Sequence, residues 1–445
     1  MKKIPLLLCA VFLLSAGLSA ETVNLEQVRS LALANSRSLA KYNLSIQNAA
    51  LEEKARVYSN LPSLSLGLGA SMSLWGAENS APVENPFDTF RANASFGVSQ
   101  KIFEGGKTLV QKAINQISSE SLRKDALAEY FNVLDAADNA YYAVLEAQAA
   151  LEAEESSLKT AVTSLSIAEI RYSSGMINQG DYLKAQADKE SRENSRNQAR
   201  RNLSLCITKL KNLTGLNAAP ALQQIEFDKY EGMIRHLGNI TDEEADTLYS
   251  RLWKLFAASN PSLAKASLSN QKAEKNLSLV KRNFSPSLSA SFSTGLNYSP
   301  QDGLKRSGGS LSLSASIPVD FWAKANSVEQ SRIALDSAAL DYLNAESSLE
   351  TELQSAVISL LTQAETVLYS RRSLEYSEKH FEYVMERFRL SQSSVSDLGD
   401  ASTLLINSRN SLIKSQYGFL RCLSQLRSFG AINDEEKLVN LLMGN

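Results

Sequence analysis

Four short segments of the chain alternate apolar and polar residues with a period of two. In the first segment, for example, Leu64 and Leu66 alternate with Ser63 and Ser65. This period places successive side chains on opposite faces of a β-strand. About a dozen residues is close to the length that a tilted strand needs to cross a membrane, and an apolar face opposite a face of small polar groups is typical of outer-membrane barrels. Nearly all polar positions hold Ser, Gly or Asn, and the segments lie at about residues 61–75, 90–103, 285–298 and 309–319.

The rest of the chain predicts long helices, because its apolar residues recur at the 3–4 spacing of a coiled-coil seam. In the first half this seam runs from Tyr130 to Tyr172, in a helix that begins near Lys107. Such a helix would have about 65 residues and a length of about 100 Å. Each half then turns back into a second helix, which ends near Leu213 in the first half and near Ser428 in the second. We therefore expect each half to form a long helical hairpin opposite its pair of strands.

The two halves are copies of one another. Arg171 corresponds to Arg387 and Asp181 to Asp397, and the offset between the long helices stays at 216 residues. The coiled-coil seam repeats at the same offset, although polar residues interrupt its second copy. The sequence therefore predicts a first repeat at 21–216, a linker or equatorial region at 217–246, a second repeat at 247–430 and a C-terminal tail at 431–445.

The N-terminus has the pattern of a secretory signal peptide. Lys2 and Lys3 precede an apolar run from Ile4 to Leu14, and small residues end the segment at Ala20. This pattern predicts that residues 1–20 are removed and that the protein is exported. No later apolar run is long enough for a membrane helix. An exported chain with amphipathic strands is best placed in a bacterial outer membrane, where closed barrels satisfy every backbone group.

Charge and residue content exclude several classes of function. The net charge is −2, and it becomes −4 once Lys2 and Lys3 are removed, which argues against nucleic-acid binding. The chain has two histidines, His236 and His380, which are too few and too far apart for a usual metal or catalytic cluster. We therefore expect no enzyme activity, no catalytic residue, no metal and no cofactor.

Four strands cannot close a membrane barrel, because the smallest such barrels need about eight strands and lipid does not tolerate open edges. Several copies must therefore pool their strands, and two copies would give eight where three would give twelve. A face of Ser and Gly suits a water-filled lumen, which the larger barrel provides. The helices of the same copies would form a second, coaxial tube. The predicted assembly is a hollow duct through the outer membrane that reaches deep into the periplasm.

The chain resembles the TolC-type outer-membrane efflux family over essentially all of its mature sequence. The order and spacing of several segments carry the resemblance: 25–27 with Leu31, Ala32 and Asn35, then 61–64, 100–106, 171–175 and 181–186. The resemblance implies a mostly helical protein with a membrane β-barrel portion. It also implies a homotrimer in which a twelve-strand β-barrel continues into a twelve-helix α-barrel. The implied partners are outer-membrane lipid, a periplasmic adaptor protein, and an inner-membrane pump or ABC transporter.

The resemblance also assigns a periplasmic gate. Asp397 and Asp400 match the paired acidic constriction of the family, and their spacing of three places them on one helix face. The alternative is that acids favour the first turn of a helix, where N–H groups are exposed. Asp181 matches a carboxylate that tethers the closed tip to a Tyr of the other hairpin. The position of that Tyr is Phe388, and a family Arg falls on Ser393, so we expect the closed state to be held differently here.

Two further groups of residues have assigned places. Gly105, Gly106 and Pro318 fall where strand becomes helix, a junction that must bend sharply, and Lys101 stands where the family usually has Pro. For Gly175 at a hairpin turn, the alternative to a binding role is an ordinary helix cap. The turn tips that match the family's adaptor contacts are Ser174, Gly175 and Met176 in the first hairpin, and Leu390, Ser391 and Gln392 in the second.

The function that these observations favour is a passive exit duct of a tripartite efflux or type I secretion system. An autonomous diffusion porin is the first alternative, although a porin does not need long periplasmic helices. A periplasmic coiled-coil scaffold without a pore is the second, although it does not need the strands. The sequence does not identify the cargo.

Overall fold

A computed structural model describes residues 22–74 and 85–444. The signal peptide expected at 1–20 lies outside the described residues. The first repeat contains α1 (Leu25–Asn35), α2 (Arg37–Tyr58), β1 (Ser63–Ser71), β2 (Arg91–Glu104), α3 (Lys107–Ser173) and α4 (Gln179–Thr214). The remainder contains α5 (Glu231–Leu237), α6 (Asp242–Ser259), α7 (Pro261–Lys281), β3 (Ser287–Ser299), β4 (Gly303–Ser316), α8 (Phe321–Arg389), α9 (Val395–Phe429) and α10 (Glu435–Met443).

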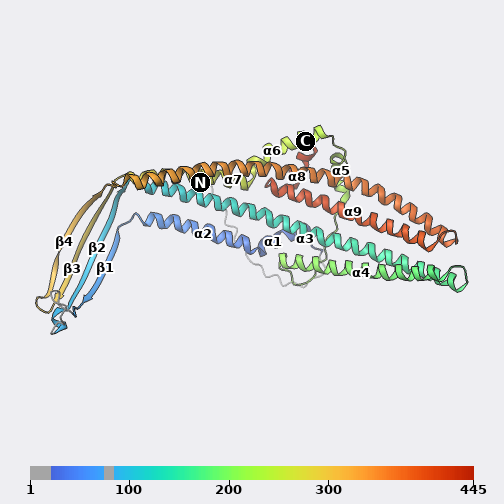
Figure 1. The fold of residues 1–445 in the computed structure, drawn as a ribbon, viewed down its shortest axis with the longest axis horizontal. Helices are drawn as coiled ribbons and strands as arrows, with labels where there is room; N and C mark the ends of the chain where they lie inside the picture. Colours follow the sequence, from blue (N-terminus) through green and yellow to red (C-terminus); the bar gives the residue numbers. More distant parts are fainter. Residues whose placement is uncertain (1–21, 75–84, 445) are drawn as a thin grey trace.

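The strands form one antiparallel sheet in the order β1-β2-β3-β4, at one end of an elongated molecule (Figure 1). Alternation of side chains gives the sheet a leucine-rich face and a serine-rich face. Leu66 is 73% and Leu311 81% exposed, while Ser291 and Ser312 pair across β3 and β4 with hydroxyl oxygens 2.8 Å apart. The four predicted strands are present. β4 begins at Gly303 rather than near residue 309, and β1 ends at Ser71.

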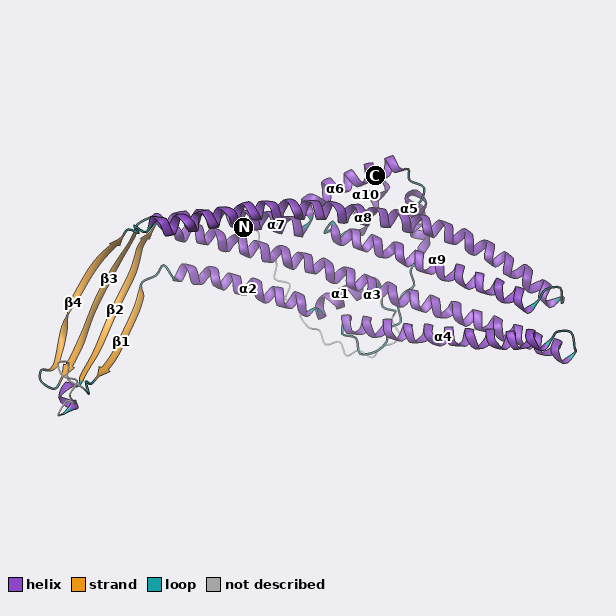
Figure 2. Cartoon of the chain, in the orientation of Figure 1, coloured by secondary structure: helices purple, strands orange, loops and turns teal. Residues whose placement is uncertain are grey.

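Two very long helices extend from the sheet. α3 has 67 residues and α8 has 69, and each turns back into a shorter antiparallel helix, α4 or α9 (Figure 2). Near the sheet, α2, α3, α7 and α8 lie side by side. Farther from the sheet, toward the hairpin turns, the helices lie side by side in the order α4, α3, α9 and α8. We call this part of the molecule the lower layer. The two hairpin turns therefore lie together at the end of the molecule opposite the sheet.

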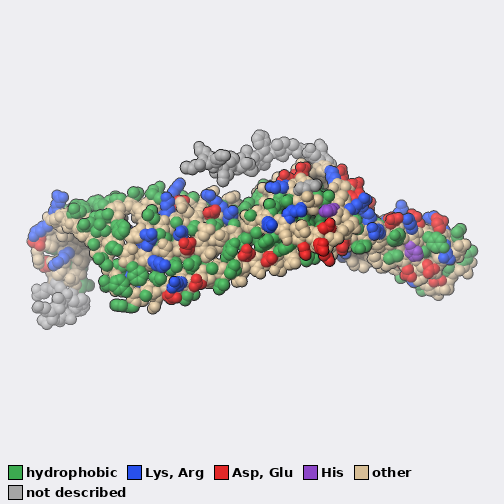
Figure 3. All heavy atoms as spheres, turned by 90° about the horizontal axis from the view of Figure 1, so that it is seen from above, with side chains coloured by type: hydrophobic (Ala, Val, Ile, Leu, Met, Phe, Trp, Pro, Cys, Tyr) green, Lys and Arg blue, Asp and Glu red, His purple; other side chains and the backbone are tan. Residues whose placement is uncertain are grey.

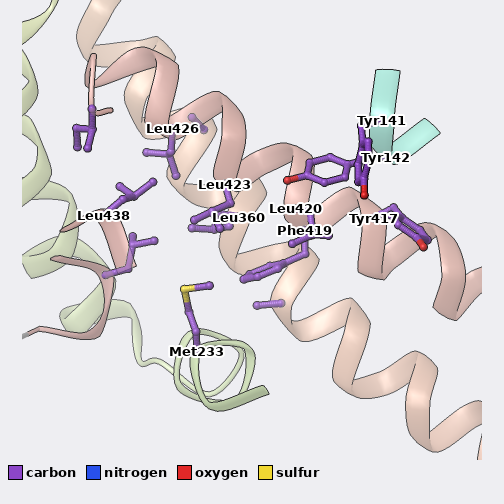
Figure 4. Packing of buried hydrophobic residues seen from close by; sticks show 14 of the residues in the cluster. Tyr141, Tyr142, Met233, Leu360, Tyr417, Phe419, Leu420, Leu423, Leu426 and Leu438 are labelled. Carbon is purple, nitrogen blue, oxygen red and sulfur yellow. The ribbon is translucent and has the colours of Figure 1, made fainter. Parts of the chain in front are cut away.

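The largest core lies midway along the helices. There the short helices α5, α6 and α10, which we call the belt, pack over α8 and α9 (Figure 4). Leu360 of α8 and Phe419 of α9 are fully buried in the same cluster as Leu438 of α10. The expected linker at 217–246 holds α5 and the start of α6, which begins at Asp242 rather than at residue 247. A capping box of Thr241 with Glu244 sets this helix start.

Among residues 22–74 and 85–444, none of the helices has a stretch both long and apolar enough to span a membrane.

Candidate functional site at the hairpin tips

The two hairpin turns have the same backbone conformation. In the first, the amide of Met176 donates to the carbonyl of Arg171 over 2.8 Å, and in the second Gln392 donates to Arg387 over the same distance. Gly175 has φ of +69°, and its equivalent Ser391 has φ of +63°. These are helix C-caps that need a left-handed residue, which glycine adopts without strain and serine does not. The capping role weighed for Gly175 is therefore present in the fold.

The tips also expose apolar side chains. Met176 is 70% and Leu390 66% exposed, and Ser174, Gly175, Ser391 and Gln392 are exposed beside them. The six residues that match the family's adaptor contacts thus share one end of the molecule. Exposed apolar groups at the ends of two adjacent hairpins form a surface that a partner could cover.

Each returning helix begins with an acidic residue in its first turn. The Asn178 side chain accepts from the amide of Asp181 over 2.9 Å, and Ser394 accepts from Asp397 over 3.1 Å. The Asp397 carboxylate also accepts from the amide of Ser394 over 2.9 Å, which completes a capping box. The backbone and side-chain hydrogen bonds from Ser394 hold the pKa of Asp397 below its usual value. Asp397 therefore caps α9 in the manner of the alternative weighed for it, while its carboxylate remains accessible.

Asp400 lies one turn further along α9 and faces a small cavity between the hairpins. The cavity has a volume of about 130 Å³ and is lined by α3, α4 and α9, with Lys184 and Asp188 opposite Asp400. Lys184 also donates to the hydroxyl of Ser396 over 2.6 Å, which ties α4 to α9. Charged side chains of α4 in the first hairpin and of α9 in the second thus line the same cavity between the hairpins.

The contact that joins the hairpins at Phe388 comes from Arg171 of α3. The guanidinium carbon of Arg171 lies 4.3 Å from the centre of the Phe388 ring, and its nitrogen donates to the backbone carbonyl of Phe388. Both side chains are buried. That carbonyl belongs to the last turn of α8, where the helix dipole favours a cation. The family resemblance points to Asp181 and Phe388 as the residues of the closed tip. It does not indicate that Arg171 contacts Phe388.

The strand-to-helix junction needs the two glycines. Gly105 and Gly106 have φ of +63° and +73°. A methyl group on Gly105 would lie 2.3 Å from the Cβ atom of Ser285, and one on Gly106 would lie 2.3 Å from a guanidinium nitrogen of Arg282. Arg282 donates to the carbonyl of Gly105 over 2.9 Å. The second repeat makes the same junction with Pro318, between the end of β4 and the start of α8.

Lys101 lies at an irregularity in the same region. The pairing of β2 with β3 shifts register between Lys101 and Phe103, and Lys101 forms an ion pair with Glu104 over 2.7 Å. A bulge bends a strand and increases its twist. Lys101 stands where the resemblance leads us to expect a proline, and here the register shift supplies a bend at that place.

A buried charge cluster was missed by the sequence analysis. The carboxylate of Asp138 on α3 is fully buried and accepts from Arg29 over 2.6 Å, from Ser424 over 2.7 Å and from Arg427 over 2.8 Å. It joins α1 of the first repeat to α9 of the second, beside the belt. Among the described residues, no three His, Cys, Asp or Glu side chains come together to hold a metal ion.

Comparison with known proteins gives one family. The sequence profile of the "Outer membrane efflux protein" family matches residues 28–216 and 252–429. The outer membrane protein TolC of Escherichia coli K12 is 22% identical, and the alignment covers 98% of this chain and 88% of TolC.

Solved structures of outer-membrane proteins have the same fold. The CmeC channel of Campylobacter jejuni superposes with a TM-score of 0.74 at 17% identity, covering 93% of this chain and 88% of CmeC. The VceC protein of Vibrio cholerae superposes with a TM-score of 0.72 at 15% identity, covering 91% of this chain and 96% of VceC.

Proposed function

Because the chain belongs to the outer membrane efflux protein family and is thus an outer-membrane protein, we propose that it is the exit duct of a tripartite efflux or type I secretion system. In this role it passively conducts substrate from an inner-membrane transporter and a periplasmic adaptor across the periplasm and the outer membrane. One observation carries the proposal: an open four-stranded sheet continues into helices of 67 and 69 residues. At 1.5 Å per residue such helices reach about 100 Å from the sheet.

The open sheet supports a homotrimer. Among the described residues, β1 and β4 each have one unpaired edge, and unpaired backbone groups are not tolerated in lipid. Three copies would pool twelve strands, with the leucine-rich face toward lipid and the serine-rich face toward water. On the face drawn in Figure 3, hydrophobic side chains are frequent toward the sheet end, with scattered charged side chains among them, whereas acidic side chains gather over the belt. This distribution suits a molecule with one end in a membrane and the other in water.

The tips support a gate and an adaptor surface. In a trimer, Asp397 and Asp400 would place six carboxylates where the tube narrows, and such a ring attracts cations. The exposed Met176 and Leu390 at the turns would contact the adaptor. The Arg171 contact with Phe388 would hold the two hairpins of each copy together in the closed state.

The test has two parts. In detergent the purified mature protein should have the mass of a trimer, and in a planar bilayer it should give discrete conductance steps. A monomer that gives no conductance would contradict the duct. Crosslinking in cells, followed by isolation of the protein, should recover an inner-membrane adaptor. A conducting trimer that recovers no adaptor would instead indicate a diffusion porin.

A further inference from the structure

The lower layer of helices ends at a different helix on each side. α3 packs against α4 and α9, and α9 packs against α8. Within the described part of the chain, α4 and α8 therefore each have one side without a long helix beside it. A tube built from several copies closes only if α8 of one copy meets α4 of the next.

One row of large side chains is exposed along α8. Tyr369, Tyr376 and Tyr383 are 65%, 68% and 61% exposed. They recur every seven residues, which in a coiled-coil helix gives a straight row with steps of about 10.5 Å. The row does not face α9, because Ser370 and Ser377, which follow two of the tyrosines, make the hydrogen bonds to α9 and consecutive residues point about 100° apart.

The chain already contains one packing of the kind that would cover this row. α3 of the first repeat packs against α9 of the second: Asn410 donates to Glu154 over 3.3 Å, and Thr160 and Gly399 line the same cavity. By the offset of 216 residues, α3 is equivalent to α8 and α4 is equivalent to α9. The packing of α8 on α4 of the next copy is therefore the α3–α9 packing moved by one repeat.

The equivalent residues are larger at this second boundary. Thr160 becomes Tyr376, and Gly399 becomes Leu183. Within the chain, the small side chains leave the cavity of about 130 Å³ open. Between copies, the tyrosine ring and the leucine side chain would occupy the corresponding space. Leu183 on α4 is 51% and Tyr376 on α8 is 68% exposed in the single chain. Each of the two side chains is therefore open to contact with the other across the boundary.

The hairpin tips give a second, independent correspondence. Within the chain, the guanidinium of Arg171 lies on the ring of Phe388. The same offset converts this pair into Arg387 and Tyr172. Arg387 is exposed. Within its own hairpin its guanidinium carbon lies 5.7 Å from the centre of the Tyr383 ring, and it donates to the carbonyl of Gln392 over 3.1 Å. The Tyr172 ring is 40% exposed and stacks on Tyr182 with centroids 5.1 Å apart. A stacked pair of rings that is partly exposed suits a planar cation.

We propose that α8 of one copy packs on α4 of the next, with Tyr376 against Leu183 of the next copy and Arg387 stacked on Tyr172 of the next copy. The row of Tyr369 and Tyr383 continues the same contact along the helix. The proposal names the residues of the boundary that the proposed duct requires. It needs a tube of several copies and therefore rests on the proposed function.

Thiol crosslinking tests the boundary directly. The two native cysteines of the mature chain, Cys206 and Cys422, are free, so each is first replaced by Ser. Tyr376→Cys together with Leu183→Cys, treated with a short bifunctional maleimide, should give a covalent trimer on a denaturing gel. The matched control pairs Leu183→Cys with Tyr58→Cys, since Tyr58 is 65% exposed but lies on α2.

Two outcomes distinguish an error in the proposed α8–α4 contact from an error in the proposed function. If the same sample has the native mass of a trimer but gives no more covalent trimer than the control, the boundary is wrong and the duct is unaffected. If the native mass is that of a monomer, the proposed duct is wrong as well.

The tip contact has its own test. Arg387→Gln and Tyr172→Leu should each lower the temperature at which the trimer dissociates in detergent. Arg387→Gln also loses the hydrogen bond to the Gln392 carbonyl of its own turn. The double variant should therefore match Arg387→Gln alone, because Tyr172→Leu then has no further contact to remove. Tyr172→Phe keeps the aromatic ring, so its trimer should dissociate at the same temperature as that of the unaltered protein. Arg389→Gln is the control, since the one ion pair that Arg389 forms within the described structure is with Glu386 of its own helix. Equal effects of Arg387→Gln and Arg389→Gln would overturn this contact.

Discussion

The guanidinium of Arg171 stacks on the ring of Phe388 with 4.3 Å between the guanidinium carbon and the ring centre, and it also donates to the backbone carbonyl of Phe388. The two residues come from different hairpins and from different repeats. Where related proteins are expected to use a carboxylate and a tyrosine, this chain joins the hairpins by an arginine on a phenylalanine. A stacked, desolvated pair of this kind contributes about 1–2 kcal/mol.

Removal of the stacking group should favour the open tip. Arg171→Gln leaves a donor of similar length but loses the cation, and about 1.4 kcal/mol corresponds to a tenfold change in an equilibrium. We therefore expect the fraction of open channels in a planar bilayer to rise about tenfold. Arg389→Gln removes an exposed arginine close to the same tip and should change nothing. Equal behaviour of the two variants would show that Arg171 does not hold the hairpins.

The acidic residues of α9 can be tested without loss of their cap. Asp397→Asn and Asp400→Asn together remove both charges, while Asn still accepts a hydrogen bond from the backbone of Ser394. If the carboxylates form the constriction, single-channel conductance should rise and the preference for cations should fall. Ser394→Ala is the control, because it weakens the cap and keeps both charges. A change with Ser394→Ala but not with the double Asn variant would assign these residues to capping alone.

The depressed pKa of Asp397 sets the pH range of this effect. Hydrogen bonds from Ser394 to the carboxylate lower the pKa below the usual 3.8, so the charge persists from neutral pH down past that value. The stability that the cap contributes is present above the unfolded pKa and is lost as the pH falls through the lowered folded pKa. The contribution of Asp397 to cation preference should thus stay constant between about pH 7 and pH 5. Reversal potentials of Asp400→Asn channels, in which Asp397 is the remaining carboxylate of the pair, measure it.

We predict that replacement of a junction glycine lowers the stability of the protein. Gly105→Ala places a methyl group 2.3 Å from the Cβ atom of Ser285, on a backbone with φ of +63°. The left-handed backbone alone costs about 1 kcal/mol for a residue with a side chain, and the clash adds to it. The melting temperature and the yield of trimer should both fall. Gly308→Ala is the control, because its methyl group meets nothing within 4 Å.

Local patterns in the sequence were sufficient to predict most of the elements. A period of two predicted the strands and a 3–4 spacing predicted the long helices, because both periods are properties of consecutive residues. The start of β4 was wrong because Lys305, Arg306 and two glycines hide the alternation there. Only its pairing with β3 makes this segment a strand: Leu304 lies opposite Tyr298 and Gly303 opposite Ser299.

The parts of the candidate site that escaped prediction depend on contacts between distant residues. Arg171 meets Phe388 only after α3 has packed against the second hairpin. Asp138 directly follows Ala137 of the coiled-coil seam and gives no local sign that Arg29 and Arg427 will surround it. The chain separates Asp138 from these two residues by 109 and 289 positions. Such contacts follow from the order of helices in the layer, which the pattern of one helix does not contain.

The charge cluster at Asp138 should contribute more to stability than any surface ion pair. Asp138→Asn leaves the buried guanidinium of Arg427 without its ion-pair partner among the described residues. It also removes the buried partner of Arg29, which keeps the more exposed Glu26 and Glu435. Breaking a buried pair costs about 3–5 kcal/mol. We expect a clear loss in the free energy of unfolding, measured by denaturant titration of the purified protein. Asp125→Asn is the matched control on the same helix, because its partner Lys265 is half exposed and exposed pairs contribute at most about 1 kcal/mol. Since the cluster joins α1 to α9, a similar small loss in both variants would mean that the belt and the hydrophobic core, and not these charges, hold the two repeats together.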